Sequence, residues 1–222
     1  MYKIFFSLAC IFSSFISSSQ VGIYGGFSTL KPFGVPSAYF GGHLGFESPR
    51  DDESSFYLRA AFYAKRKLDP LMSIPLTYSL VPLKDTDPFS SVSGYSTFNY
   101  TTIDGGYRYY ILDGYESGFA LYGGTNVMGV INKVKLKLDD FDTDKYRLDN
   151  STQINGTILS MGAGLSGGAK YTLAGVCTFY IDATMDYLFA LIPSNQLAVN
   201  QFSSFGSQIL FSVNLGVRKD LY

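Results

Sequence analysis

The chain of 222 residues has no tryptophan, and only 16% of its residues are charged. Ordinary globular chains carry roughly 25% charged residues, so this surface holds less charge than a water-facing surface usually does. The formal net charge of -1 leaves no basic excess and argues against a nucleic-acid partner. No stretch after residue 20 approaches the roughly 20 apolar residues of a membrane helix. If the chain enters a membrane, strands must therefore cross it, because only helices and closed barrels satisfy their backbone groups in lipid.

Sequence motifs for catalysis and for cofactors are also missing. There is no glycine-rich phosphate loop, nucleophile elbow or paired-cysteine motif. His43 is the only histidine, which is too few for a histidine metal site. The acidic run of residues 139–144 lacks the glycine and the terminal glutamate of a calcium loop, so we interpret it as a solvated loop. We expect no enzyme activity, no cofactor and no metal.

The first 19 residues have the pattern of a secretory signal peptide. Lys3 is followed by an apolar run and then by Ser17, Ser18 and Ser19. We predict cleavage after Ser19 and a single barrel domain over residues 20–222. Lipid attachment at Cys10 is disfavoured because the apolar run continues past it. Cleavage would leave Cys177 as the only cysteine, which excludes an intrachain disulfide, so the exported domain has to be stable without one.

The mature chain is rich in segments where apolar and polar residues alternate, which places one set of side chains on each face of a strand. The last segment sets Ile209, Phe211 and Val213 against Gln208, Ser212 and Asn214, and the chain ends on the aromatic Tyr222. Eight segments have this character, at residues 20–29, 38–47, 55–66, 96–112, 118–131, 156–170, 173–191 and 208–218.

The connections between these segments alternate in length. Two of them are long, at residues 67–95 and 132–155, and those that flank them are short. Short turns at one end and long loops at the other are typical of a barrel in the bacterial outer membrane. We therefore predict an all-β fold, an eight-stranded antiparallel up-and-down transmembrane β-barrel. A soluble lipocalin-like barrel, with its apolar face turned inward, is the competing fold.

Three stretches carry a resemblance to a known family: Val21–Gly26, Asp104–Tyr110 and Phe211–Arg218. With them the chain resembles the outer-membrane β-barrel domain family common in Bacteroidota, related in architecture to the OmpA/OmpX-type eight-stranded barrels. The resemblance spans essentially all of the mature chain and implies fold and location in the cell outer membrane. It does not imply an activity. Lys219 and Asp220 interrupt the usual pattern at the tail.

The predicted inward faces carry charged residues that could form a network inside the barrel. Unpaired charge in a narrow interior is costly, so acids and bases there should pair. The predicted lumen network consists of Arg59, Lys65, Asp104, Arg108, Asp182, Asp186 and Arg218.

The function expected from these features is non-enzymatic. A monomeric barrel with a side-chain-filled lumen would act in envelope structure, or would bind envelope or extracellular proteins through loops 67–95 and 132–155. One alternative is a narrow channel for small or hydrophobic solutes. A second is a lipid-modifying enzyme that depends on His43. We expect outer-membrane lipid to surround the barrel.

Overall fold

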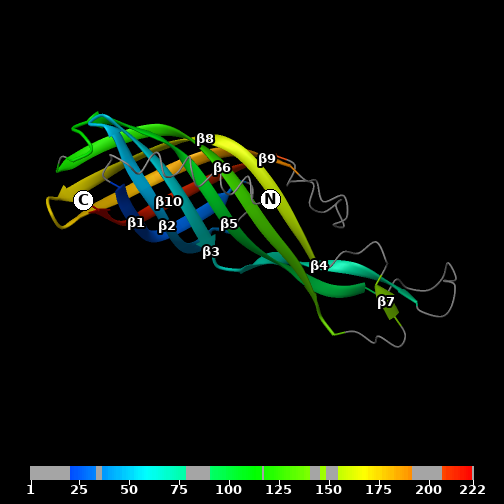
Figure 1. Ribbon diagram of the computed structural model, residues 1–222. Helices are drawn as coiled ribbons and strands as arrows, with labels where there is room; N and C mark the ends of the chain where they lie inside the picture. Colours follow the sequence, from blue (N-terminus) through cyan, green and yellow to red (C-terminus); the bar gives the residue numbers. More distant parts are fainter. Residues whose placement is uncertain are drawn as a thin grey trace, which may run out of the picture.

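The computed structural model describes residues 21–33, 37–78, 91–116, 118–140, 146–148, 155–191 and 207–221. Every regular element in this part of the chain is a strand (Figure 1). No helix that could span a membrane occurs among these residues. The strands are β1 (Val21–Pro32), β2 (Tyr39–Asp51), β3 (Ser54–Tyr63), β4 (Arg66–Tyr78), β5 (Ser91–Leu112), β6 (Phe119–Leu138), β7 (Tyr146–Leu148), β8 (Asn155–Leu173), β9 (Cys177–Ala190) and β10 (Ser207–Leu221).

Eight of these strands close into an antiparallel barrel. Neighbours along the chain pair with one another, β10 pairs with β1, and β3 pairs with β5, so the ring runs β1, β2, β3, β5, β6, β8, β9, β10. β1 pairs along its full length with β10, from Val21 opposite Leu221 to Pro32 opposite Leu210. The barrel therefore has no free edge along this seam, and the predicted fold class is confirmed.

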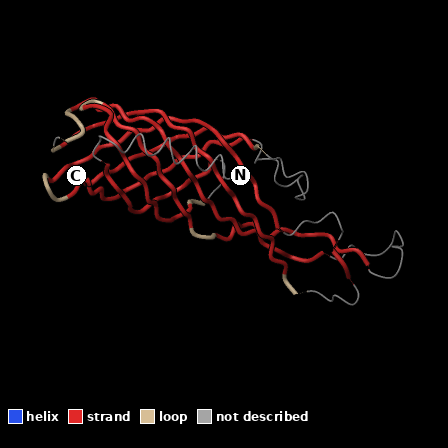
Figure 2. The backbone as a smooth tube through the Cα atoms, in the orientation of Figure 1, coloured by secondary structure: helices blue, strands red, loops and turns tan. Residues whose placement is uncertain are grey.

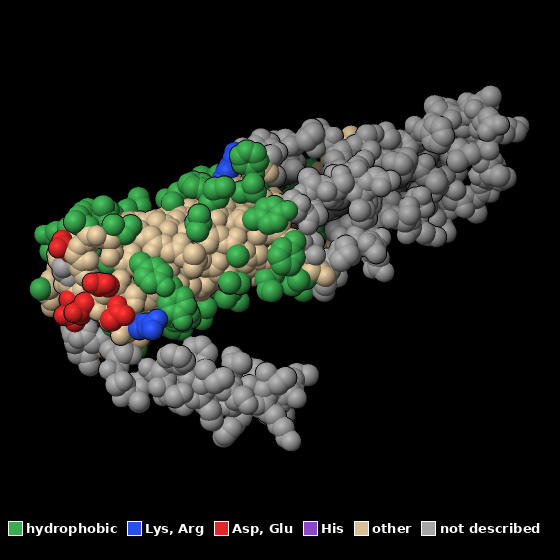
Figure 3. Space-filling view, turned by 90° about the horizontal axis from the view of Figure 1, so that it is seen from above, with side chains coloured by type: hydrophobic (Ala, Val, Ile, Leu, Met, Phe, Trp, Pro, Cys, Tyr) green, Lys and Arg blue, Asp and Glu red, His purple; other side chains and the backbone are tan. Residues whose placement is uncertain are grey.

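The two faces of each strand have opposite polarity, and the apolar face points outward. On β9 the side chains of Ile181 and Met185 are exposed, whereas Asp182 and Asp186, which directly follow them in the sequence, are buried. The same arrangement covers the surface with hydrophobic side chains along the barrel (Figure 3). A soluble lipocalin-like barrel requires the reverse orientation, so that alternative is wrong.

The short turns meet at one end, here called the turn end, where the C-terminal end of β10 also lies (Figure 1). Between β2 and β3, Asp51 Oδ1 accepts hydrogen bonds from Ser54 Oγ at 2.8 Å and from the Glu53 amide at 3.0 Å. These bonds, of which the one from Ser54 has the largest effect, hold the pKa of the exposed Asp51 below its ordinary value. Gly114 of the β5–β6 turn comes so close that an added Cβ would lie 2.8 Å from the Asp52 carbonyl oxygen. The turn end is thus a set of mutually bonded tight turns.

The opposite end, here called the loop end, carries an arm that extends past the barrel. β4, the first part of β5 and the last part of β6 continue beyond the other strands (Figure 2). Residues 67–95 and 132–155 were expected to be loops, and this expectation is wrong for much of both segments. β4 tolerates Pro70 because this residue falls in a register shift of its pairing with β5. On the other side of β4 only residues 76–78 pair, with β7, so within the described part of the chain most of that side has no neighbouring strand. Residues 79–90, 141–145 and 149–154 lie outside the described part.

Other expected boundaries shift by a few residues, mostly because the strands are longer than the alternation indicated. β8 runs to Leu173 and the turn to β9 occupies residues 174–176, whereas we expected strand again from residue 173. The signal peptide and Tyr222 lie outside the described residues, so the cleavage after Ser19 stays a prediction.

A pair of glycines on opposite faces offers a test of how tightly the strands approach. Replacing the inward-facing Gly106 with alanine should lower the free energy of unfolding by about 1–3 kcal/mol, because the new Cβ would lie 2.0 Å from the Thr125 carbonyl oxygen. Gly129→Ala on the outer face is the control, since its nearest atom is 3.8 Å away. Urea unfolding of both variants, followed by circular dichroism, measures the difference. Equal losses would contradict the close inward approach.

Candidate functional site in the barrel lumen

A ladder of ion pairs with alternating sign runs through the lumen from the turn end. Near that end, Arg218 Nε lies 3.0 Å from Asp220 Oδ1, and Arg218 Nη1 lies 3.1 Å from Glu47 Oε2. Glu47 Oε2 is also 2.8 Å from Arg108 Nη1. Ser55 and Tyr110 donate hydrogen bonds to the other oxygen of Glu47, at 2.6 and 2.8 Å. Glu47 is thus one of two carboxylates that each contact two arginines. We call these two carboxylates the nodes of the ladder, and Glu47 is the node nearer the turn end.

Asp182 is the second node of the ladder, farther from the turn end. Its Oδ2 lies 2.9 Å from Arg108 Nη2, and its Oδ1 lies 2.8 Å from Arg59 Nη1. Asn214 Nδ2 donates a further hydrogen bond to Oδ1 at 2.8 Å. Arg59 completes the ladder with a two-bond contact to Asp104, Nε to Oδ1 at 3.0 Å and Nη2 to Oδ2 at 2.8 Å. We call this set the lumen ladder: Asp220, Arg218, Glu47, Arg108, Asp182, Arg59 and Asp104.

Burial makes this pairing necessary. The side chains of Arg59, Asp104 and Asp182 are at most 2% exposed. An ion removed from water costs several kcal/mol, which neighbouring charges offset only when geometry is good and the remaining polar atoms are hydrogen-bonded. Each arginine here contacts two carboxylates, and each of the two nodes contacts two arginines. Every charged group of the ladder is therefore in contact with a group of opposite charge.

A second polar cluster surrounds the single histidine. His43 Nδ1 and Ser28 Oγ lie 2.7 Å apart, and Ser28 Oγ also donates to Asn214 Oδ1 at 2.5 Å. His43 Nε2 is hydrogen-bonded to the Tyr180 hydroxyl. His43 is 3% exposed and Ser28 is fully buried. Asn214 links this cluster to Asp182, so His43 and Ser28 belong to the packed interior.

The predicted network residues do not all join the ladder. Arg59, Asp104, Arg108, Asp182 and Arg218 are brought together, as described above. Asp186 is buried but bonds to Asn126 Nδ2 at 2.6 Å, and no ion pair with it is found in the described part.

Lys65 was expected to point into the lumen, and this is wrong. It is exposed, because it lies in the two-residue break between β3 and β4 where the strand alternation stops.

Sequence reasoning missed four lumen residues. Glu47 continues the inward set of His43 and Gly45, so the alternation itself could have identified it. Asp220 continues the inward set of β10 but was taken as an interruption of the tail. Lys170 is 3% exposed near the end of β8. No periodic pattern marks Tyr115, because it lies in a turn.

Tyr115 closes the lumen at the turn end. It is 2% exposed, and its ring packs under Arg218, whose Cζ is 4.0 Å from the ring centroid. Lys170 Nζ donates to the Tyr115 carbonyl oxygen, and the Tyr115 hydroxyl donates to Asp220 Oδ1 at 3.1 Å. The β5–β6 turn thus folds a ring across the lumen and fixes it to the ladder.

The loop-end half of the lumen is filled by apolar and aromatic side chains. They form one contiguous buried cluster, with Tyr39 and Tyr100 in edge contact at a ring-centroid distance of 4.8 Å. On the turn-end side of this cluster, a cavity bordered by Glu47, Arg108 and Tyr122 measures about 10 Å³, which is room for about one water molecule. The cluster consists of Leu30, Tyr39, Ala61, Tyr63, Phe98, Tyr100, Met128, Val130, Val134, Ile158, Leu188 and Leu210.

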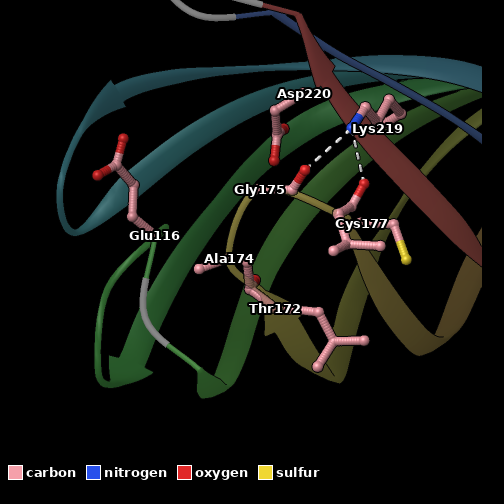
Figure 4. A pocket seen from close by; sticks show the side chains of 9 residues that line it. Glu116, Thr172, Ala174, Gly175, Cys177, Lys219 and Asp220 are labelled. Atoms are coloured by element: carbon pink, nitrogen blue, oxygen red, sulfur yellow. Dashed lines mark hydrogen bonds between the residues drawn. The ribbon is translucent and has the colours of Figure 1, made fainter.

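A larger cavity of about 140 Å³ lies outside the lumen, at the rim of the turn end (Figure 4). Lys219 crosses it and donates to the carbonyl oxygens of Val176 at 2.8 Å and Gly175 at 3.3 Å. The half-buried free thiol of Cys177 is on its wall. Lys219 thereby fastens the β8–β9 turn to the last strand. No group of His, Cys, Asp or Glu side chains in the described part could hold a metal ion.

Among the described residues, the exposed charges at the two ends of the barrel are mostly of opposite sign. Carboxylates gather at the turn end, as Figure 3 shows; the exposed ones are Asp51, Asp52, Glu53, Asp113 and Glu116, beside Arg50 and Lys219. At the loop end the exposed charges of the described residues are mostly basic: Lys31, Lys65, Arg66, Lys67, Lys133, Lys135 and Lys137, beside Asp139 and Asp140.

Comparison with known proteins gives similarities in fold only. The chain matches no protein-family model and no curated protein. Among solved structures it is similar to Ail, the attachment invasion locus protein of Yersinia pestis, in complex with the heparin analogue sucrose octasulfate. The identity is 14%, over 91% of this chain and 99% of that chain, with a TM-score of 0.45.

Two further solved structures are similar to this chain in fold to about the same degree. Neisserial surface protein A is 13% identical over 90% of this chain and 95% of its own, with a TM-score of 0.49. The outer membrane protein OprG from Pseudomonas aeruginosa is 15% identical over 92% and 97%, also with a TM-score of 0.49. Similarity at this level does not extend to function.

Proposed function

We propose that this chain is a non-enzymatic barrel of a bacterial outer membrane, with a closed lumen and an arm at the loop end that contacts other molecules. The observation that carries the proposal is the polarity of the wall. Apolar side chains such as Leu44 and Leu165, each 67% exposed, cover the outside, whereas the lumen ladder is buried inside. Lipid-facing and lumen-facing residues alternate in this way in transmembrane barrels. The signal peptide predicted over residues 1–19 agrees with export.

The interior supports a structural role for the buried charges. The ladder pairs each of its charges with an opposite charge, Tyr115 covers the turn end, and apolar side chains fill the loop-end half. A catalytic His43 would need an opening to lipid or water, and it is enclosed between Ser28 and Tyr180. The barrel thus acts as a rigid support, and the arm built on β4, β5 and β6 supplies the surface for partners.

Reconstitution tests the proposal. The expressed protein should float with membranes, resist carbonate extraction and migrate differently on a denaturing gel before and after heating. In planar bilayers it should show no single-channel conductance, because the cavity described inside the lumen has room for only about one water molecule. Recovery in the soluble periplasm would overturn the membrane assignment. Steady conductance would favour the narrow channel instead.

A further inference from the structure

The outward face of β6 changes from apolar to basic as the strand leaves the barrel. Val127 is 57% exposed and Ile131 is half-buried, and both point outward. The next three outward positions are Lys133, Lys135 and Lys137, all exposed. Because side chains on one face of a strand recur every second residue, the three ammonium groups follow the apolar positions in a single row.

A fourth lysine on β4 widens this row into a surface. Lys67 pairs with Thr97 of β5, and Thr97 pairs with Lys135 of β6, so the three residues lie side by side across three strands. Lys67 Nζ is held 3.9 Å from the centroid of the Tyr95 ring, and Tyr95 pairs with Lys137. We call Lys67, Lys133, Lys135 and Lys137 the basic face.

No carboxylate neutralises the basic face within the described residues. None of its four lysines takes part in an ion pair there, and Asp139 and Asp140 follow only after β6 ends. Strand geometry sets neighbouring lysines about 7 Å apart along β6 and about 10 Å apart across two strands. Those separations are within the screening length of about 8 Å at physiological salt or close to it, so the ammonium groups repel one another. A ligand with several negative groups would relieve this repulsion.

The position of the basic face identifies the kind of anion. Lys133 lies two residues after the outward Ile131 on β6, at the boundary where the apolar wall ends and a membrane surface would begin. Lysine stems can lie along apolar surface while their ammonium groups reach the headgroup level. We propose that the basic face binds the phosphate groups of anionic lipid headgroups in the leaflet at the loop end. The inference rests on the proposed membrane location.

Lipid selectivity of the reconstituted full chain tests this proposal. The folded protein is inserted into phosphatidylcholine bilayers that contain a trace of spin-labelled phosphatidic acid, and the motionally restricted fraction is measured. Wild type should prefer phosphatidic acid over spin-labelled phosphatidylcholine by about fivefold for each lysine that a headgroup contacts. The variant K133Q/K135Q/K137Q should lose most of that preference.

Matched controls make the outcomes distinct. R50Q/K219Q removes the two exposed basic side chains of the turn end and should leave the selectivity of wild type unchanged. Equal selectivity in wild type and in the triple variant would overturn the proposal while the membrane assignment stands. Binding of a soluble heparin oligosaccharide without enrichment of phosphatidic acid would also overturn it, in favour of an external polyanion. Failure of every variant to insert into bilayers would overturn the proposed function itself.

Discussion

Replacement of Asp182 with alanine is expected to lower the free energy of unfolding by about 3–5 kcal/mol, the cost of leaving buried charge uncompensated. Asp182 is the only carboxylate in the described part that contacts both Arg59 and Arg108. Its removal leaves one Nη of each arginine without its charged partner, in a place where water has little room. The amide of Asn214 loses the shorter of its two hydrogen bonds in the same step and keeps the one to Ser212 Oγ at 3.3 Å.

Urea unfolding of the protein refolded in liposomes measures this loss. The chain has no tryptophan, so circular dichroism and the heat-dependent shift on gels are the suitable signals. Asp139→Ala removes an exposed carboxylate at the end of the arm and should change stability by less than about 0.5 kcal/mol. A loss below 1 kcal/mol for Asp182→Ala would mean that solvent enters the lumen and solvates both arginines.

Asp182→Leu and Asp182→Met should also be destabilising, since an apolar residue of similar volume can replace a buried ion only when all its partners are replaced too. The ladder is a single connected set in which Glu47 and Asp182 share Arg108. Effects at these two nodes should therefore not add, because contacts in one network couple. The ladder stabilises one arrangement of the barrel interior as a unit.

Alternation in the sequence was sufficient to assign the strands and the face on which each side chain lies. It was insufficient to predict how far along the barrel axis a residue lies and which residues it contacts. It placed Asp182 and Arg59 inside, but these residues are 123 positions apart and meet only because the barrel closes. It also placed Asp186 inside, yet there Asp186 accepts a hydrogen bond from the Asn126 amide and has no ion pair among the described residues. A period of two tells which side of the wall a residue occupies, and the register of eight strands decides what it faces.

The arm was harder to predict than the barrel for a related reason. Pro70 and Pro75 argue against a central strand, and residues 67–95 were therefore interpreted as a loop. A strand that is open along most of one side can hold prolines, and β4 is such a strand. Lys133 and Lys135 likewise looked like loop residues because their charge ended the apolar pattern. The apolar pattern ends where lipid contact would end, and β6 continues beyond it.

The prediction that separates a membrane barrel from any soluble one concerns Leu165, at the middle of β8 on the outer face. Leu165→Arg should lower the free energy of unfolding in liposomes by about 2–4 kcal/mol, because a charge at the bilayer midplane is desolvated. On a water-facing surface the same change would alter stability by no more than about 0.5 kcal/mol.

Leu173→Arg provides the depth control, because Leu173 is on the same strand and face but next to the turn end. Near the interface an arginine costs about 0–1 kcal/mol, since its side chain can reach the headgroups. Urea titration of both variants in the same liposomes gives the two losses directly. A large loss at position 165 with a small one at 173 requires that hydrocarbon surround the middle of the barrel. Equal, small losses would mean that the exposed leucines, phenylalanines and methionines of this wall are in contact with water.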